Sequence, residues 1–270
     1  MKVTFIGGGN MAFAMIGGLR RQGFSAAALQ VVEPNEAARA RLDETFGVRC
    51  AATADAAALN GEVLVLAVKP QQLRAAVAPL IAHLDRQVVL SIAAGLRLVD
   101  IARWLDGYPR LVRCMPNTPA AIGAGVSGLY AAPEVDAIGR SHAEHVMQAV
   151  GGTVWLSREE DMDAVTAISG SGPAYVFYFM EAMVQTAVNM GLSLEAAKKL
   201  TVDTFSGAAR LVEQSTETIE TLRRQVTSKG GTTEAALNAF DAARVGAGIA
   251  QGVLAAQARG RELGELLGKE

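Results

Sequence analysis

The sequence is poor in the residues that build disulfide frameworks and metal sites. Its two cysteines, Cys50 and Cys114, are too few for a disulfide framework and are typical of a reducing compartment. Of its three histidines, His83 stands alone, while His142 and His145 are one turn apart on a predicted surface helix. Neither cysteine lies near a histidine in a metal-ligand spacing, so we predict no metal site.

A charge imbalance and long apolar runs are also missing. The formal net charge is −2 with no basic block, which argues against a nucleic-acid partner. The most apolar runs, at 63–68 and 174–180, are far shorter than a bilayer span, so no membrane segment is expected. The chain opens with a predicted strand and a glycine loop instead of a charged stretch and an apolar signal core. We therefore expect a cytoplasmic protein.

The first half of the chain alternates strand-like and helix-like segments, the pattern of a parallel sheet with crossover helices. The predicted strands are 2–6, 29–33, 63–68, 88–93 and 111–115, with weaker candidates at 126–130 and 153–156. The predicted helices between them are 10–22, 36–46, 71–84 and 98–105. Runs such as VLVLAV suit strands buried on both faces. We predict an α/β Rossmann-type dinucleotide-binding domain over 1–157.

Beyond residue 155 strand signals vanish, and helices are predicted at 161–168, 173–190, 194–213, 219–226 and 233–267. We predict an all-helical second domain over 158–270. In the helix at 173–190 only Glu181, Gln185 and Asn189 form a polar stripe, and such a stripe is usually a solvent or cleft face. A helix that is apolar around most of its girth must be enclosed. Its own domain or a second subunit can enclose it, and we favour the second subunit.

The first strand runs into a glycine motif of the form G-x-G-x-x-A, followed at once by a helix. This position between a first strand and a first helix indicates a dinucleotide-binding loop. Gly7 permits the tight turn, Gly9 lets the backbone approach the pyrophosphate, and the small Ala12 allows close packing of helix on strand. The helix N-terminus faces the phosphates. The predicted cofactor residues are Gly7, Gly8, Gly9, Asn10, Met11 and Ala12.

Glu33 ends the second predicted strand, where an acidic residue accepts hydrogen bonds from the adenosine ribose. A carboxylate there favours NADH because it repels a 2′-phosphate, although Asn35, Arg39 and Arg41 nearby can soften that preference. The alternative is an exposed glutamate at a strand end. Because ligands lie beyond the carboxyl ends of parallel strands, two later loops should also line the cofactor cleft. They contain Ala67, Val68, Lys69 and Pro70, and Ala93, Ala94 and Gly95.

Three further strings are more distinctive: CMPNTP at 114–119, SGSGPAY at 169–175 and VTSKGGTT at 226–233. Together with GGGNMA, AVKP and SIAAG, in this order over nearly the whole chain, they closely resemble pyrroline-5-carboxylate reductase. The resemblance implies reduction of the cyclic imine Δ1-pyrroline-5-carboxylate to L-proline with NADPH or NADH, the last step of proline synthesis. It implies a Rossmann domain, a helical dimerisation domain, a homodimer and in many members a ring of dimers. Asn117, in the first string, is assigned to the cofactor site.

The last string opens a predicted helix. Gly230 and Gly231 expose consecutive backbone N–H groups at a helix start, which suits a substrate carboxylate. The resemblance implies that Thr233 offers its hydroxyl to the ring nitrogen, and that Ser228, Gly231 and Thr232 hold the carboxylate. Lys229 stands where the family commonly has proline, and it adds charge for the carboxylate. The alternative is that one of the two threonines only caps the helix.

Two other functions compete with this one. A β-hydroxyacid dehydrogenase also joins a Rossmann domain to a helical domain, but it needs a catalytic lysine on the first helix of the second domain. The stretch 169–190 contains no lysine. A non-catalytic NAD(P)-binding module would not need the loop at 226–233. Hydride transfer to a protonated imine needs positioning and no metal or covalent nucleophile, which agrees with the scarcity of such groups.

Overall fold

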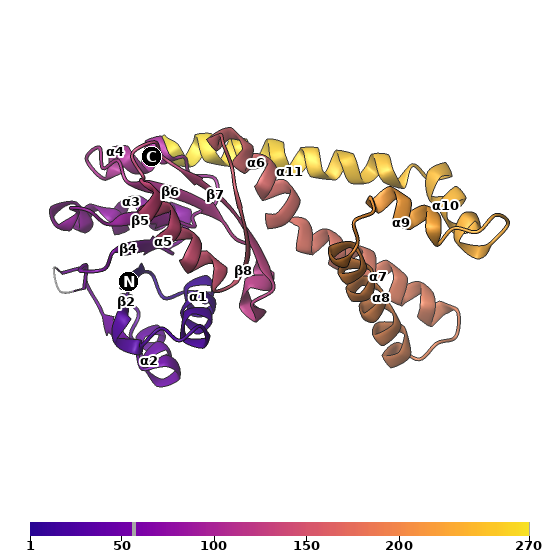
Figure 1. Cartoon of the computed structure of the whole chain (residues 1–270), viewed down its shortest axis with the longest axis horizontal. Coiled ribbons are helices and arrows are strands. Elements are labelled where there is room, and N and C mark those ends of the chain that lie inside the picture. The colour runs from indigo at the N-terminus through magenta and orange to yellow at the C-terminus, as the bar shows by residue number, and fades with distance from the viewer. Residues whose placement is uncertain (56–57, 270) are drawn as a thin grey trace. The chain divides into compact units, whose positions relative to one another are not determined.

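The computed structural model describes residues 1–55 and 58–269 and contains two compact units (Figure 1). The first unit is Met1–Pro173 together with Ala256–Glu270, and the second is Ala174–Ala255. Glu270, where the expected second domain ends, lies outside the described residues. The last strand ends at Trp155, close to the expected change from strands to helices. The chain nevertheless returns at its end to the unit that contains the sheet.

The described residues of the first unit form one eight-stranded sheet in the order β3-β2-β1-β4-β5-β6-β7-β8. From β3 to β6 all neighbours are parallel. The strand order reverses beside β1, which pairs with β2 on one side and β4 on the other, and such a switch point is where open α/β sheets bind ligands. The strands are β1 (Val3–Ile6), β2 (Leu29–Val32), β3 (Arg49–Ala51), β4 (Val63–Leu66), β5 (Val88–Ser91), β6 (Leu111–Met115), β7 (Gly125–Ala131) and β8 (Gly151–Trp155).

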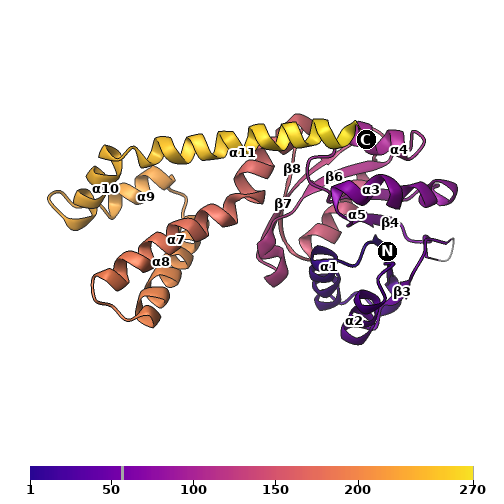
Figure 2. The ribbon, with the colours of Figure 1, turned by 180° about the vertical axis from the view of Figure 1, so that it is seen from behind.

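Helices cover both faces of the sheet. One apolar core joins α1 and α5 to strand residues such as Phe5 and Val65, while a second joins α3 and α4 to Leu64 and Leu66. Figure 1 shows α5 on one face, and Figure 2 shows α3 on the other. Strands β1, β2, β4 and β5 are buried at every residue, which confirms the expectation of continuous burial. The helices of this unit are α1 (Asn10–Arg21), α2 (Glu36–Phe46), α3 (Pro70–Val77), α4 (Leu98–Trp104), α5 (Ala137–Gln148) and α6 (Met162–Val165).

The sheet departs from the predicted all-parallel pattern at β7, which runs antiparallel to β6. Only residues 116–124, with the short helix η3 (Thr118–Ile122), connect the two strands. A parallel crossover needs about a dozen or more residues, so this connection permits only the antiparallel arrangement. The longer connection through α5 returns the chain to make β8 parallel to β7. The short strand β3 was not predicted.

Two predicted helices are shorter than expected. The helix at 71–84 ends as α3 at Val77 and continues as the tighter turn η2 (Ala78–His83), because Pro79 has no N–H and its ring clashes with the preceding turn. The helix at 161–168 is α6 followed by η5 (Thr166–Gly170), a wider helical turn. The short turn η4 (Glu159–Asp161) precedes it.

The second unit is built from α7 (Gly172–Asn189), α8 (Leu194–Gln214), α9 (Ile219–Gln225), α10 (Thr232–Ala242) and the first part of α11 (Val245–Gly268). The single helix predicted at 233–267 is therefore wrong: it breaks at Arg244, whose φ of 55° lies in the left-handed region. The unit has almost no core of its own, since α7, α9 and α10 contain no buried residue. Phe177 and Tyr178 on α7 are 62% and 76% exposed. No helix among the described residues has the length and apolarity to cross a bilayer.

Candidate functional site

The glycine loop lies at the switch point of the sheet, between β1 and α1. Gly7 has a φ of 101°, and a Cβ there would lie 2.8 Å from the Ala67 carbonyl oxygen, so both its conformation and the neighbouring loop require glycine. A Cβ on Gly9 would meet no atom within 4 Å, and Gly9 is the N-cap of α1 without a side-chain cap. The space beside Gly9 is therefore open where the helix N-terminus presents its N–H groups, the arrangement that binds a pyrophosphate. Ala12 is fully buried.

The Glu33 carboxylate, just beyond β2, is held by the main chain of two loops. One oxygen accepts a hydrogen bond from the Gly8 N–H at 2.8 Å and the other from the Asn35 N–H at 2.8 Å. The Arg39 guanidinium donates to the backbone carbonyls of Glu33 and Pro34 at 2.8 and 2.7 Å. Glu33 therefore faces the glycine loop, which contradicts the alternative of an exposed strand-end glutamate.

The other two residues expected to weaken the preference of Glu33 for NADH, Asn35 and Arg41, direct their side chains to other partners. The Asn35 side chain caps α2 by accepting from the Ala38 N–H at 2.9 Å. The Arg41 guanidinium lies over the Phe13 ring, 3.9 Å from its centroid. Of the three, Arg39 is thus the cation that adjoins Glu33.

The loops after β4 and β5 continue the same edge of the sheet. Ala67 and Val68 pack directly against Gly7, Lys69 is the N-cap of α3, and Pro70 occupies its first turn as predicted. Residues 93–95 follow β5, the strand that pairs with β4. The structure therefore brings the first three predicted cofactor loops together through neighbouring parallel strands.

The Asn117 side chain is held by hydrogen bonds to two other segments of the first unit. The Asn117 amide donates to the Ser169 carbonyl at 3.2 Å and accepts from the Val126 N–H at 3.0 Å, so it ties the loop after β6 to β7.

Burial raises the pKa of the Cys114 thiol far above its ordinary value, and burial is also the largest cause that raises the pKa of Cys50. Both thiols are therefore protonated near neutral pH, and neither supplies a thiolate nucleophile.

The loop before α10 belongs to the second unit. Gly230 has a φ of 73°, and its N–H donates to the Glu234 carboxylate at 2.7 Å. Gly231 is the N-cap of α10 and has no side-chain cap, so the alternative that Thr232 or Thr233 caps this helix is wrong. The first backbone bond of α10 runs from the Ala235 N–H to the Gly231 carbonyl. The N–H groups of residues 232–234 thus precede the helical ladder and point toward the loop.

Two contacts from far along the chain bear on this edge of the sheet and were not predicted. The Glu159 carboxylate accepts from the Leu98 N–H at 2.7 Å, and the backbone of Gly264 lies against Gly95. Each contact joins residues so far apart in the sequence that no local sequence pattern predicts it. Among the described residues, no three histidine, cysteine, aspartate or glutamate side chains are grouped to hold a metal ion.

Comparisons with known proteins agree with the two parts of the chain. Residues 2–95 match the family model described as NADP oxidoreductase coenzyme F420-dependent. Residues 159–263 match the model described as pyrroline-5-carboxylate reductase dimerisation. The Rossmann-type domain is thus followed by a helical dimerisation domain, as predicted.

Whole-chain relatives give a more specific result. The pyrroline-5-carboxylate reductase of Pseudomonas aeruginosa is 44% identical over 99% of this chain and 98% of its own, and that of Haemophilus influenzae is 40% identical over 97% of each. The solved structure of a pyrroline-5-carboxylate reductase from Coxiella burnetii has a TM-score of 0.91 at 38% identity, covering 97% of this chain and 98% of that one. The Plasmodium falciparum pyrroline carboxylate reductase, solved with NADP bound, has a TM-score of 0.86 at 25% identity and covers 98% of each chain. This chain belongs to the pyrroline-5-carboxylate reductase family.

Proposed function

We propose that this protein reduces Δ1-pyrroline-5-carboxylate to L-proline, with NADPH or NADH as hydride donor. Identity of 44% over 99% of the chain to a curated reductase is the observation that carries the proposal. The competing assignment to a β-hydroxyacid dehydrogenase lacks its chemistry, because α7 contains no lysine. A non-catalytic module would not need the motif at 226–233.

The proposed cofactor site uses the sheet edge of the first unit. When bound, the reduced nicotinamide supplies a hydride for the imine carbon, and the ring nitrogen ends as the amine of proline. The open space beside Gly9 fits the close approach of a pyrophosphate to the N-terminus of α1. The loops after β4, β5 and β6 have the placement that ligands of open parallel sheets require. They contribute Ala67–Pro70, Ala93–Gly95 and Asn117.

The proposed substrate site uses the loop before α10. In the part of the chain that the structure describes, the N–H groups of residues 232–234 have no hydrogen-bond partner. Together with the exposed Lys229 they supply positive potential for the substrate carboxylate. Ser228, Gly230, Gly231 and Thr232 complete that pocket. Among the described residues, no hydrogen bond uses the Thr233 hydroxyl, which leaves it able to donate to the ring nitrogen. Such a bond orients the imine and stabilises the nitrogen as its electron density rises during hydride transfer.

Oligomerisation completes the proposal. We propose that residues 158–270 form a homodimer, because α7, α9 and α10 bury no residue within one chain, and that the dimers assemble into rings, as the resemblance implies. Two residues of the polar stripe on α7 also bind each other, since the Gln185 amide donates to the Asn189 side chain at 3.0 Å. We further propose a cytoplasmic location, where Cys50 and Cys114 remain free thiols.

The first prediction concerns the reaction. Purified protein should oxidise NADPH or NADH in the presence of Δ1-pyrroline-5-carboxylate without added metal, and a chelator should not inhibit it, because a protonated imine is already electrophilic. Absorbance at the reduced-nicotinamide band measures the rate, and chromatography identifies proline. Turnover of 3-hydroxyacids with no turnover of the imine would contradict the proposal.

The second prediction concerns Glu33. Replacing it by serine or arginine should improve NADPH relative to NADH, because the change removes a carboxylate that repels the 2′-phosphate beside Arg39. The altered preference should be about 1–2 kcal/mol, the scale of a charged hydrogen bond. Specificity constants for both cofactors measure it. Glu36→Ser is the control, since Glu36 is an exposed acid on α2 of the same charge. An unchanged ratio in the Glu33 variants would show that this residue does not face the ribose.

A further inference from the structure

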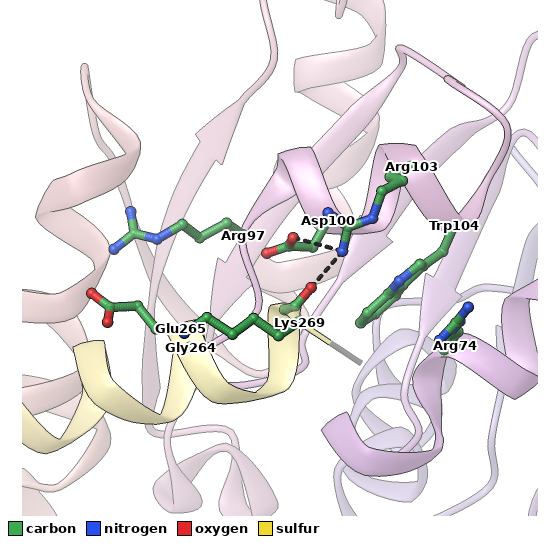
Figure 3. A pocket seen from close by; sticks show the side chains of 9 residues that line it. Arg74, Arg97, Asp100, Arg103, Trp104, Gly264, Glu265 and Lys269 are labelled. Carbon is green, nitrogen blue, oxygen red and sulfur yellow. Dashed lines mark hydrogen bonds and ion pairs between the residues drawn. The ribbon is translucent and has the colours of Figure 1, made fainter.

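The C-terminal end of α11 lies directly on the loop that follows β5. Among the described residues of α11, Gly264 and Gly268 are the buried ones, and they are one turn apart on the same face. A Cβ on Gly264 would lie 2.5 Å from the Gly95 carbonyl oxygen. The helix backbone therefore touches the loop backbone with no side chain between them. Figure 3 shows Gly264 beside the segment that leads into α4.

The next turn of α11 holds the start of α4 in a similar way. A Cβ on Gly268 would collide with the Asp100 carboxylate. Arg103 pairs with that carboxylate at 3.1 Å and also donates to the Gly268 carbonyl (Figure 3). Asp100 is buried, so its position depends on these partners. Gly95 in the loop and Asp100 in the first turn of α4 thus both lie against α11.

The contact matters because it acts on the outer end of the loop, whose first residue, Ala93, is already buried in the apolar core beside β5. Beyond Ala93, Ala94 is exposed, and Gly95, with a φ of 84°, lies against the backbone of Gly264. The loop after β4 differs, because it packs directly against Gly7. A backbone contact in a closely packed interior transmits displacement, since neither partner has a flexible side chain to absorb it.

We propose that Gly264 is a positioning residue for the cofactor loop Ala93–Gly95. Its lack of a side chain lets α11 seat the Gly95 carbonyl and set the path of the loop toward the nicotinamide cofactor. Gly268 and Arg103 hold the following helix in register with it. The inference rests on the proposed role of residues 93–95 in cofactor binding.

The test compares Gly264→Ala with Gly260→Ala. Both are glycine-to-alanine changes on the same helix, one turn apart, but a Cβ on Gly260 would lie at an ordinary 3.9 Å from the nearest atom, the Thr166 methyl carbon. Fluorescence titration should show NADPH binding at least about tenfold weaker in Gly264→Ala and within about twofold of wild type in Gly260→Ala. The KM for the imine should change much less than the KM for the cofactor. If Gly264 served only to stabilise the fold, Gly264→Ala would lower the melting temperature without changing the cofactor KM more than the imine KM.

Several outcomes decide between the proposals. Wild-type affinity for NADPH in folded Gly264→Ala overturns the positioning role. If Gly264→Ala does not fold, Arg103→Gln replaces it. The Arg103 side chain is mostly exposed, so this change removes only its contacts with the Asp100 carboxylate and the Gly268 carbonyl. At least threefold weaker binding then supports the role, and unchanged binding overturns it. Failure of the wild-type protein to bind either cofactor would instead refute the proposed function.

Discussion

Gly9→Val is expected to abolish dinucleotide binding while the fold persists. The backbone at Gly9 has φ −69° and ψ −176°, which any residue adopts, and its Cβ would point into open space. The valine side chain therefore costs the apo protein little but occupies the volume through which a pyrophosphate must approach the N-terminus of α1. We expect affinity for NADPH and NADH to fall more than ~100-fold, a loss of roughly 2.7 kcal/mol or more.

Calorimetric titration measures this affinity, and circular dichroism with thermal melting checks the fold. Gly152→Val is the matched control. It introduces the same side chain into open space on β8, at the far edge of the sheet, where a β-branched residue suits a strand. The control should bind both cofactors normally. Ordinary affinity in Gly9→Val would refute the assignment of the glycine loop.

Thr233→Ala is expected to lower turnover by about 10- to 100-fold, which corresponds to the roughly 1.5–3 kcal/mol of a hydrogen bond to a group that gains charge. Folding should be little affected, because the hydroxyl neither caps α10 nor bonds to another described residue. Steady-state kinetics with saturating cofactor measures the change. Thr233→Ser keeps the hydroxyl and should retain most of the activity. Equal losses in both variants would point to packing of the methyl group instead.

Mixing these two defective proteins tests whether neighbouring subunits share a site. We propose that the loop before α10 of one subunit serves the cofactor bound by its partner. After subunit exchange between equal amounts of Gly9→Val and Thr233→Ala, half of the dimers are mixed, and each mixed dimer then carries one site with both loops intact. Activity should return to about a quarter of wild type.

The alternative arrangement gives a different result. If every chain completes its own site, no pairing of the two variants rebuilds one, and the mixture should show only the mean of its parents. Analytical ultracentrifugation of each variant establishes that both remain dimers, and a mixture without exchange serves as the control. Activity at the parental mean after proven exchange would contradict a shared site.

The parts of this protein that could be predicted from sequence are those specified by neighbouring residues. Three elements were predicted at their observed bounds: the glycine loop, the helix Glu36–Phe46 and the strand Leu111–Met115. Turn residues bound them, and the spacing of their apolar residues indicates helix or strand. Fully buried strands reveal themselves by unbroken apolar runs. Membership of the reductase family likewise followed from strings that can be seen in the sequence, and relatives of the whole chain confirm it.

Other features depend on contacts between residues far apart in the chain. Strand β3 is too short to carry a pattern and forms by pairing with β2. Arginine is not a helix-stop residue, yet Arg244 adopts the left-handed conformation that separates α10 from α11. The position of Gly95 depends on Gly264, and that of Leu98 on Glu159, across separations at which sequence periodicity carries no information. Backbone packing and hydrogen bonding across such distances arise only when the chain is folded, because the energy of each contact depends on both partners being in place.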